Sequence, residues 1–151
     1  MGRFVPEITA NVELQVRVHP GDDPGALERV IAAEGRRAAR ELYLRIVEAM
    51  DEQALATTKG ARQRREPRWV ATLFGRVRIL RYRVNNETES FHPLDRVMDL
   101  RRSEASQAVR NLIIELAGRL SNRGVAQVIT EITGETFTYQ HVHRVLRERG
   151  E

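Results

Sequence analysis

One stretch of this sequence, from Lys59 to Arg83, carries its excess positive charge. It reads KGARQRREPRWVATLFGRVRILRYR and holds nine basic residues against one acid, a net charge of +8. The flanking segments have net charges of −3 and −1, and the whole chain has +4. Positive charge concentrated in one segment is typical of a surface that binds a polyanion such as DNA. The residues predicted to contact phosphates are Lys59, Arg62, Arg64, Arg65, Arg68, Arg76 and Arg78. A solvated basic loop beside a charged edge strand is the alternative.

A second set of polar side chains suited to DNA contact lies near the C-terminus. At 100° per residue, a helix over residues 139–149 has two distinct faces. Its packing face consists of Thr138, Tyr139, Val142, Val145 and Leu146, and its polar face consists of Gln140, His143, Arg144 and Arg147. The polar residues start near the helix N-terminus, where a recognition helix meets base edges. We predict that this face contacts DNA, with a solvated face on an ordinary helical bundle as the alternative.

Other chemistries have less support. The chain has no cysteine, and His141 and His143 are roughly 200° apart around a helix, so they cannot chelate one ion together. Asp95 and Asp99, if helical, form an i, i+4 pair that could bind a cation, which makes a small metal-dependent nuclease a weaker alternative. No Gly-rich phosphate loop is present. We therefore expect no catalytic residue, no metal site and no cofactor.

Length and composition set the outer limits. A chain of 151 residues, with 41% apolar and 30% charged side chains, forms one domain or two small lobes. No apolar run approaches the about 18–20 residues of a membrane span, and no secretory signal is visible at the N-terminus. We predict a cytoplasmic protein that has no contact with a membrane.

The first third of the chain predicts a strand and a long helix. Apolar and polar residues alternate from Ile8 to Val18, which indicates a half-buried strand. His19–Asp22 forms a turn, and Asp23 is the expected N-cap of an amphipathic helix from Ala26 to about Leu55. The apolar stripe of this helix either packs on the sheet of its own domain, which we favour, or mediates dimerisation.

The basic stretch divides into a loop and a hairpin. Residues 59–68 lack apolar periodicity and contain Gly60 and Pro67, so we predict a loop. Residues 69–84 have β-branched, aromatic and aliphatic side chains on both sides of Gly75, which predicts a β-hairpin. The two-residue period places Arg76 and Arg78 on one face and two further arginines on the other. The sequence leaves open which pair is exposed.

The C-terminal third predicts three helices. Ser103 is the expected cap of the first, Ser121 or Asn122 opens the second, and Gly134 ends it. Thr138 is the expected N-cap of the third helix. Two short helices joined by a brief turn after a supporting helix match the helix-turn-helix of DNA-binding proteins.

These motifs together resemble the N-terminal region of insertion-sequence transposases of the ISLre and ISKra groups. The hairpin matches their T-x-FG-x-V-x-x-x-R signature at Thr72, Phe74-Gly75, Val77 and Arg81. The long helix ends in a similar segment, Met50–Leu55, and Pro93-Leu94-Asp95 follows the hairpin. The helix-turn-helix matches at Ser121, Ala126, Thr133-Gly134, Thr138 and Val142-His143-Arg144. The resemblance covers roughly residues 27–150 in the same order.

The resemblance implies a region that binds the ends of a transposable element, ahead of a ribonuclease-H-like catalytic domain. Because the chain stops at Glu151, where such a domain would begin, we expect neither strand transfer nor cleavage from it. A stand-alone DNA-binding relative, a truncated element product and one piece of a split protein with a separate catalytic chain are the interpretations that follow.

The sequence thus predicts an α+β fold. A small antiparallel sheet, made of the N-terminal strand and the hairpin, packs on the long helix in residues 1–90. Residues 91–102 connect it to a helix-turn-helix lobe in residues 103–151. The predicted function is non-catalytic binding of double-stranded DNA, with a homodimer through the long helix as a further expectation. The rival is a protein-interaction module whose basic segment docks on an acidic protein surface.

Overall fold

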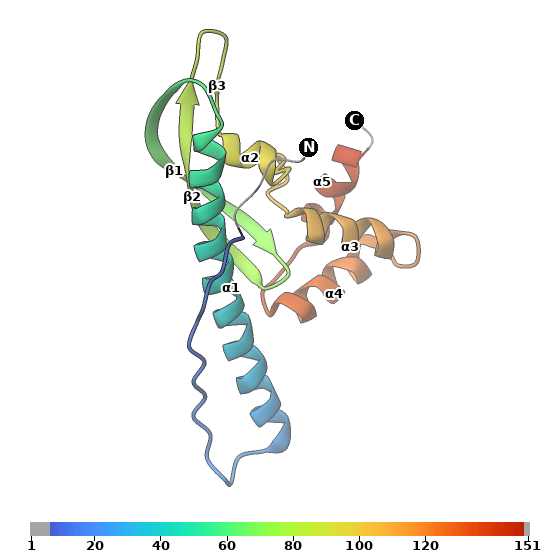
Figure 1. The fold of residues 1–151 in the computed structure, drawn as a ribbon. Helices are drawn as coiled ribbons and strands as arrows, with labels where there is room; N and C mark the ends of the chain where they lie inside the picture. The colour runs from blue at the N-terminus through green and yellow to red at the C-terminus, as the bar shows by residue number, and fades with distance from the viewer. Residues whose placement is uncertain (1–6, 150–151) are drawn as a thin grey trace.

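One long helix, α1 (Pro24–Ala56), organises the molecule. The computed structural model describes residues 7–149, and within them α1 extends over 33 residues. Its start is as predicted, because the Asp23 carboxylate accepts the backbone N–H of Ala26 at 3.2 Å and Pro24 occupies the first turn. Figure 1 shows the second half of α1 against the sheet and the first half projecting beyond it.

A three-stranded antiparallel sheet forms the second layer. Its strands are β1 (Ala61–Thr72), β2 (Gly75–Asn85) and β3 (Ser90–Phe91), in that order across the sheet. Thr72 pairs with Gly75 at the tip of the β1–β2 hairpin, and Gly75 has a φ of 111°, which favours glycine. The predicted hairpin is therefore confirmed, and the fold is α+β as expected.

The predicted loop over residues 59–68 is wrong, because β1 already begins at Ala61. The first half of β1 consists mainly of charged and polar residues, so it shows no alternation of apolar and polar side chains. Arg62 and Arg65 lie over the ring of Tyr82, at 4.7 and 4.9 Å from its centroid, so their aliphatic stems and planar heads cover it as an apolar residue would. A register shift between Arg62 and Arg65 further disrupts the period.

The predicted N-terminal strand is also wrong. Residues 7–19 form no β-bridge within the described chain, although Figure 1 shows them extended alongside the first half of α1. Side chains of α1 hold them there: Arg37 donates to the carbonyl of Glu13 at 3.1 Å, and Arg45 donates to the carbonyl of Asn11. Apolar and polar residues do alternate in this segment, but it pairs with no strand of the sheet.

The second half of α1 packs on the sheet, which was the preferred interpretation of its apolar stripe. Val47 joins Val70, Val77, Ile79 and Leu94 in one hydrophobic cluster. The buried carboxylate of Asp51 accepts the backbone N–H of Tyr82 in β2 at 3.2 Å, and burial raises the pKa of Asp51.

Four shorter helices follow. A short helix, α2 (Pro93–Val97), lies in the predicted connector, after β3. The C-terminal helices are α3 (Gln107–Ala117), α4 (Asn122–Thr133) and α5 (Tyr139–Arg149). Ser121 caps α4, and Gly134 ends it with a φ of 75°, both as predicted. The predicted cap of α3 was wrong: Ser106 caps it, while Ser103 binds the carboxylate of Glu148 in α5.

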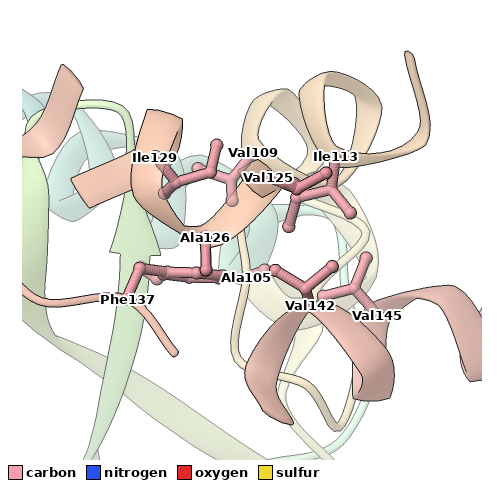
Figure 2. Close-up of a cluster of buried hydrophobic side chains, with 10 residues drawn as sticks. Ala105, Val109, Ile113, Val125, Ala126, Ile129, Phe137, Val142 and Val145 are labelled. Carbon is pink, nitrogen blue, oxygen red and sulfur yellow. The ribbon is translucent and has the colours of Figure 1, made fainter. Parts of the chain in front are cut away.

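The C-terminal helices enclose a second hydrophobic cluster, shown in Figure 2. Its described members are Ala71, Ala105, Val109, Ile113, Val125, Ala126, Ile129, Phe137, Val142 and Val145. Ala71 comes from β1, next to Val70 of the first cluster. Its backbone N–H and C=O bind Glu104 and Ser106, at 2.8 and 2.9 Å. The hairpin therefore contributes to both clusters and fixes the C-terminal helices to the sheet.

None of the helices in residues 7–149 combines the length and the apolar character needed to span a bilayer.

Candidate nucleic-acid interface

The polar face predicted on α5 is exposed. Gln140, His143, Arg144 and Arg147 are all solvent-exposed. Within the part of the chain that the structure describes, none of the four side chains forms an ion pair with an acid. Val142 and Val145, on the opposite face, are 0% and 2% exposed and anchor the helix in the second cluster (Figure 2). The helix thus presents a continuous polar surface with two arginines.

Two residues of the predicted packing face, Thr138 and Tyr139, are exposed instead. Tyr139 is 44% exposed, and the guanidinium of Arg123, from the first turn of α4, lies 5.1 Å from its ring centroid. Tyr139 therefore borders the polar face at the start of α5. Thr138 caps this end as predicted, because its hydroxyl accepts the backbone N–H of His141 at 3.2 Å.

His141 links α5 to the rest of the molecule. Its ring stacks on Phe137, with centroids 4.3 Å apart, and its Nε2 lies 2.5 Å from the carbonyl of Ser103. Burial lowers the pKa of His141, and the nearby charges of Arg144 and Arg76 lower it further. Arg144 belongs to α5 and Arg76 to the hairpin, so two predicted DNA-contacting segments meet around this ring.

The question of which hairpin arginines face outward is now answered. Arg76 and Arg78 alternate with buried Val77 and are exposed. Arg76 also lies 5.0 Å from the ring centroid of Trp69, which is 45% exposed on the same face. Arg78 makes no ion pair within the described residues. Arg76 therefore brings a positive charge close to α5, whereas Arg78 lines a hollow with Arg65 and with Glu48 of α1.

The opposite hairpin face holds an internal ion-pair network. Arg81, only 7% exposed, binds Asp95 of α2 through Nε at 3.1 Å. Arg83 binds Glu66 at 2.6 Å, which lowers the pKa of Glu66 to about 2. His92 also contacts Glu66, at 3.2 Å, but burial lowers the pKa of His92. The Arg81–Asp95 pair holds α2 against the sheet, whereas the Arg83–Glu66 pair joins β2 to β1.

Three of the predicted phosphate contacts are similarly engaged. Arg68 binds Asp95 at 3.0 Å, and its side chain is 16% exposed. Arg62 and Arg65 form longer ion pairs, of 3.5 to 3.6 Å, with Glu48 and Glu52 of α1. The charge concentrated in the sequence is thus partly neutralised in the fold, because the acids of α1 and α2 lie opposite these arginines.

Lys59 and Arg64 are exposed, but they lie at the other end of the hairpin. Arg64 is seven residues from Ala71, the partner of Arg76. At about 3.3 Å per residue, this separates the two groups by ~23 Å. The exposed charges of this one basic segment are therefore spread along the length of the hairpin.

Two exposed arginines that border the α5 surface were not predicted. Arg102 lines a shallow hollow together with Arg144 and Arg147, and Arg123 contacts Tyr139. The only sequence signals were the Arg101-Arg102 pair before the helical region and the position of Arg123 next to a helix start. Neither distinguishes a binding residue from a solvated one.

The weaker nuclease alternative loses its geometric basis. Asp99 lies beyond the end of α2 with a φ of 51°, so it does not share a helical face with Asp95. Asp95 binds Arg68 and Arg81, whereas Asp99 binds Arg110 at 2.8 Å. Among the described residues, no group of three or more His, Asp or Glu side chains is arranged to hold a metal ion.

Comparison with protein-family models, with curated proteins and with solved structures gives no match to this chain. The resemblance to insertion-sequence transposases therefore stays a prediction from the motifs.

Proposed function

We propose that this chain is a non-catalytic, cytoplasmic protein that binds double-stranded DNA through α5. In this proposal α5 is the recognition helix, and Gln140, His143 and Arg144 approach base edges in the major groove. Arg147, further along the same face, contacts base or phosphate. The transposase resemblance favours the ends of a mobile element as the DNA.

The exposed polar face of α5 is the observation that carries the proposal. Elsewhere, many arginines of this protein are bound to acids of the same chain, as Arg68, Arg81 and Arg83 are. Arg144 and Arg147 instead remain exposed without an acidic partner in the described residues. Polar residues that contribute nothing to the core and cluster on a rigid helix are well placed for a partner rather than for stability.

The hairpin supplies the second part of the interface. Arg76 and Arg102 lie close to the α5 surface, and Arg78 continues the exposed positive charge from Arg76 along β2. Such contacts position a duplex without reading its sequence. Five arginines, Arg76, Arg78, Arg102, Arg144 and Arg147, then face the phosphates or base edges.

Binding to a mixed-sequence duplex, measured by fluorescence anisotropy between about 50 and 200 mM salt, tests the proposal. With about five phosphates neutralised, log K should fall against log salt with a slope of roughly −4 to −5. The variants Arg144→Ala and Arg147→Ala should each weaken binding. Selection from randomised duplexes would then define a preferred site.

Arg29→Ala is the matched control, because Arg29 is an exposed arginine near the start of α1, at the far end of the molecule (Figure 1). It removes the same charge without touching the proposed surface. No binding at the lowest salt concentration, or an equal loss from Arg29→Ala and Arg144→Ala, would contradict the assignment of α5.

A protein-interaction module remains the second candidate. Leu27, Val30 and Ile31, on the projecting half of α1, are 36%, 45% and 52% exposed, and apolar residues grouped in this way mark interaction sites. If the basic segment docks on an acidic protein, an acidic polypeptide should compete with DNA for the arginine surface. Light scattering of the mixtures separates a stoichiometric protein complex from DNA binding.

A further inference from the structure

The first half of α1 and the extended segment before it form an arm that projects from the body of the molecule (Figure 1). Its tip exposes apolar side chains from both parts. Leu14, Val16 and Val18 are 61%, 37% and 45% exposed on the extended segment. Leu27, Val30 and Ile31 are exposed on the adjacent helix. Six such residues at one end of a small protein are costly in water unless something covers them.

Only one edge of the extended segment has its backbone hydrogen-bonding groups paired. Asn11, Glu13 and Gln15 direct backbone groups to α1, where Arg45, Arg37 and Glu34 bind them. In an extended chain, the N–H and C=O groups of successive residues point to opposite edges. The groups of Val12, Leu14 and Val16 therefore point away from α1, and they form no hydrogen bond within the described residues. This edge has the hydrogen-bonding pattern of an unpaired strand.

The segment is complementary to itself. In an antiparallel pair of two copies centred on Gln15, Leu14 lies opposite Val16, and Val12 lies opposite Val18. The same register places Glu13 of each copy opposite Arg17 of the other. Neither Glu13 nor Arg17 has an ion-pair partner within the described residues, and opposite charges across a strand pair stabilise it.

We propose that residues 11–19 of two copies of the chain pair as an antiparallel two-stranded ribbon at the tips of their arms. The ribbon satisfies the open backbone edge and brings the exposed Leu14, Val16 and Val18 of both copies together. The two-fold axis passes through Gln15. This differs from a seam between two long helices, because the contact is made by the strand that the sequence predicts and the single chain leaves unpaired.

A cysteine at the axis gives a direct test. The native chain has no cysteine, so Gln15→Cys introduces a single thiol per copy. Residues facing each other at a pair without direct backbone hydrogen bonds have Cα atoms about 4.5 Å apart, within the range of a disulfide. Mild oxidation should convert Gln15→Cys to a covalent dimer. Thr9→Cys, on the same face but six residues from the axis, should remain largely uncross-linked.

Charge reversal tests the register independently. Sedimentation velocity across a concentration series should show a dimer of twice 17.3 kDa. Glu13→Arg or Arg17→Glu creates two like-charge pairs per dimer and should raise the dissociation constant by roughly tenfold. The double variant Glu13→Arg/Arg17→Glu restores opposite charges and should restore the dimer. Circular dichroism verifies that each variant is folded, as expected for exposed positions.

The outcomes are decisive in either direction. A dimer that both single reversals weaken and the double reversal restores supports the ribbon. A protein that stays monomeric at about 100 µM contradicts it, as does a dimer insensitive to the reversals or equal cross-linking at positions 9 and 15. The result does not depend on DNA, so it stands or falls separately from the function proposed for α5.

Discussion

The carboxylate of Glu135 accepts the backbone N–H of Arg76 at 2.8 Å, across 59 residues of sequence. Glu135 lies in the turn between α4 and α5, and Arg76 lies just after the tip of the hairpin. This bond fixes the hairpin arginines relative to the proposed recognition helix. The two parts of the proposed interface are therefore held together by a bond at the turn between α4 and α5.

Removing this bond should loosen the link between the two parts. We expect Glu135→Ala to lower the free energy of unfolding by about 1–2 kcal/mol, because the N–H of Arg76 loses its partner. Urea denaturation followed by circular dichroism measures the change. Glu131→Ala is the control, since Glu131 is exposed on α4 and has no ion pair in the described chain. Equal losses from both variants would show that the bond contributes nothing specific.

Asp95 should contribute more than Glu135 to the free energy of unfolding, because it binds two poorly exposed arginines. Asp95→Asn leaves Arg68 and Arg81, whose side chains are 16% and 8% exposed, without a counter-charge. Breaking a buried pair of this kind typically costs about 3–5 kcal/mol. Glu89→Gln removes the partner of Arg96 in an exposed pair and should cost less than about 1 kcal/mol. Thermal melts of the two variants provide the comparison, and similar melting temperatures would contradict it.

The ends of α4 and the start of α5 were predictable because their sequence signals are local. Each cap, Ser121, Gly134 or Thr138, acts on the helix next to it. The helical period of α5 is enough to predict which of its polar side chains are exposed. The pairing of Arg68 with Asp95 was not predictable, because it depends on which residues the hairpin and α2 bring together over 27 positions. The segment 8–18 has the correct alternation for a strand, but alternation cannot show where its neighbour lies.

Two glycines should respond in opposite ways to the same substitution. Gly134 has a φ of 75°, and a Cβ there would lie 2.6 Å from Nε of Arg36. Gly134→Ala should therefore destabilise the fold by about 1–2 kcal/mol. Gly35 lies within α1, and a Cβ added there would meet no heavy atom within 4 Å, so Gly35→Ala should stabilise by about 1 kcal/mol. Differential scanning calorimetry measures both, and shifts of the same sign would refute the assignment.

The proposed interface predicts that hairpin arginines differ in their effect on DNA binding. Arg78 is exposed and has no acidic partner in the described residues, whereas Arg65 is held by Glu48 and Glu52. Arg78→Ala should reduce the magnitude of the salt slope by about 0.9, the value for one phosphate contact. Arg65→Ala should leave the slope nearly unchanged. The reverse order would place DNA on the other end of the hairpin, near Lys59 and Arg64.

Glu66 should make the fold sensitive to acid. Its hydrogen bonds with Arg83, and then with His92, lower its pKa from 4.5 to about 2 in the folded protein. A carboxylate with a lowered folded pKa stabilises above its unfolded pKa, and the contribution is lost as the pH falls toward the folded value. The native protein should therefore lose this stability between about pH 5 and pH 2. Glu66→Gln should be less stable than the native protein at about pH 6, and the difference should shrink by about pH 3, as urea titrations at each pH would measure. Glu87→Gln, at an exposed loop position, should show no such convergence; if it did, the acid sensitivity would have to be assigned to groups other than the Glu66–Arg83 pair.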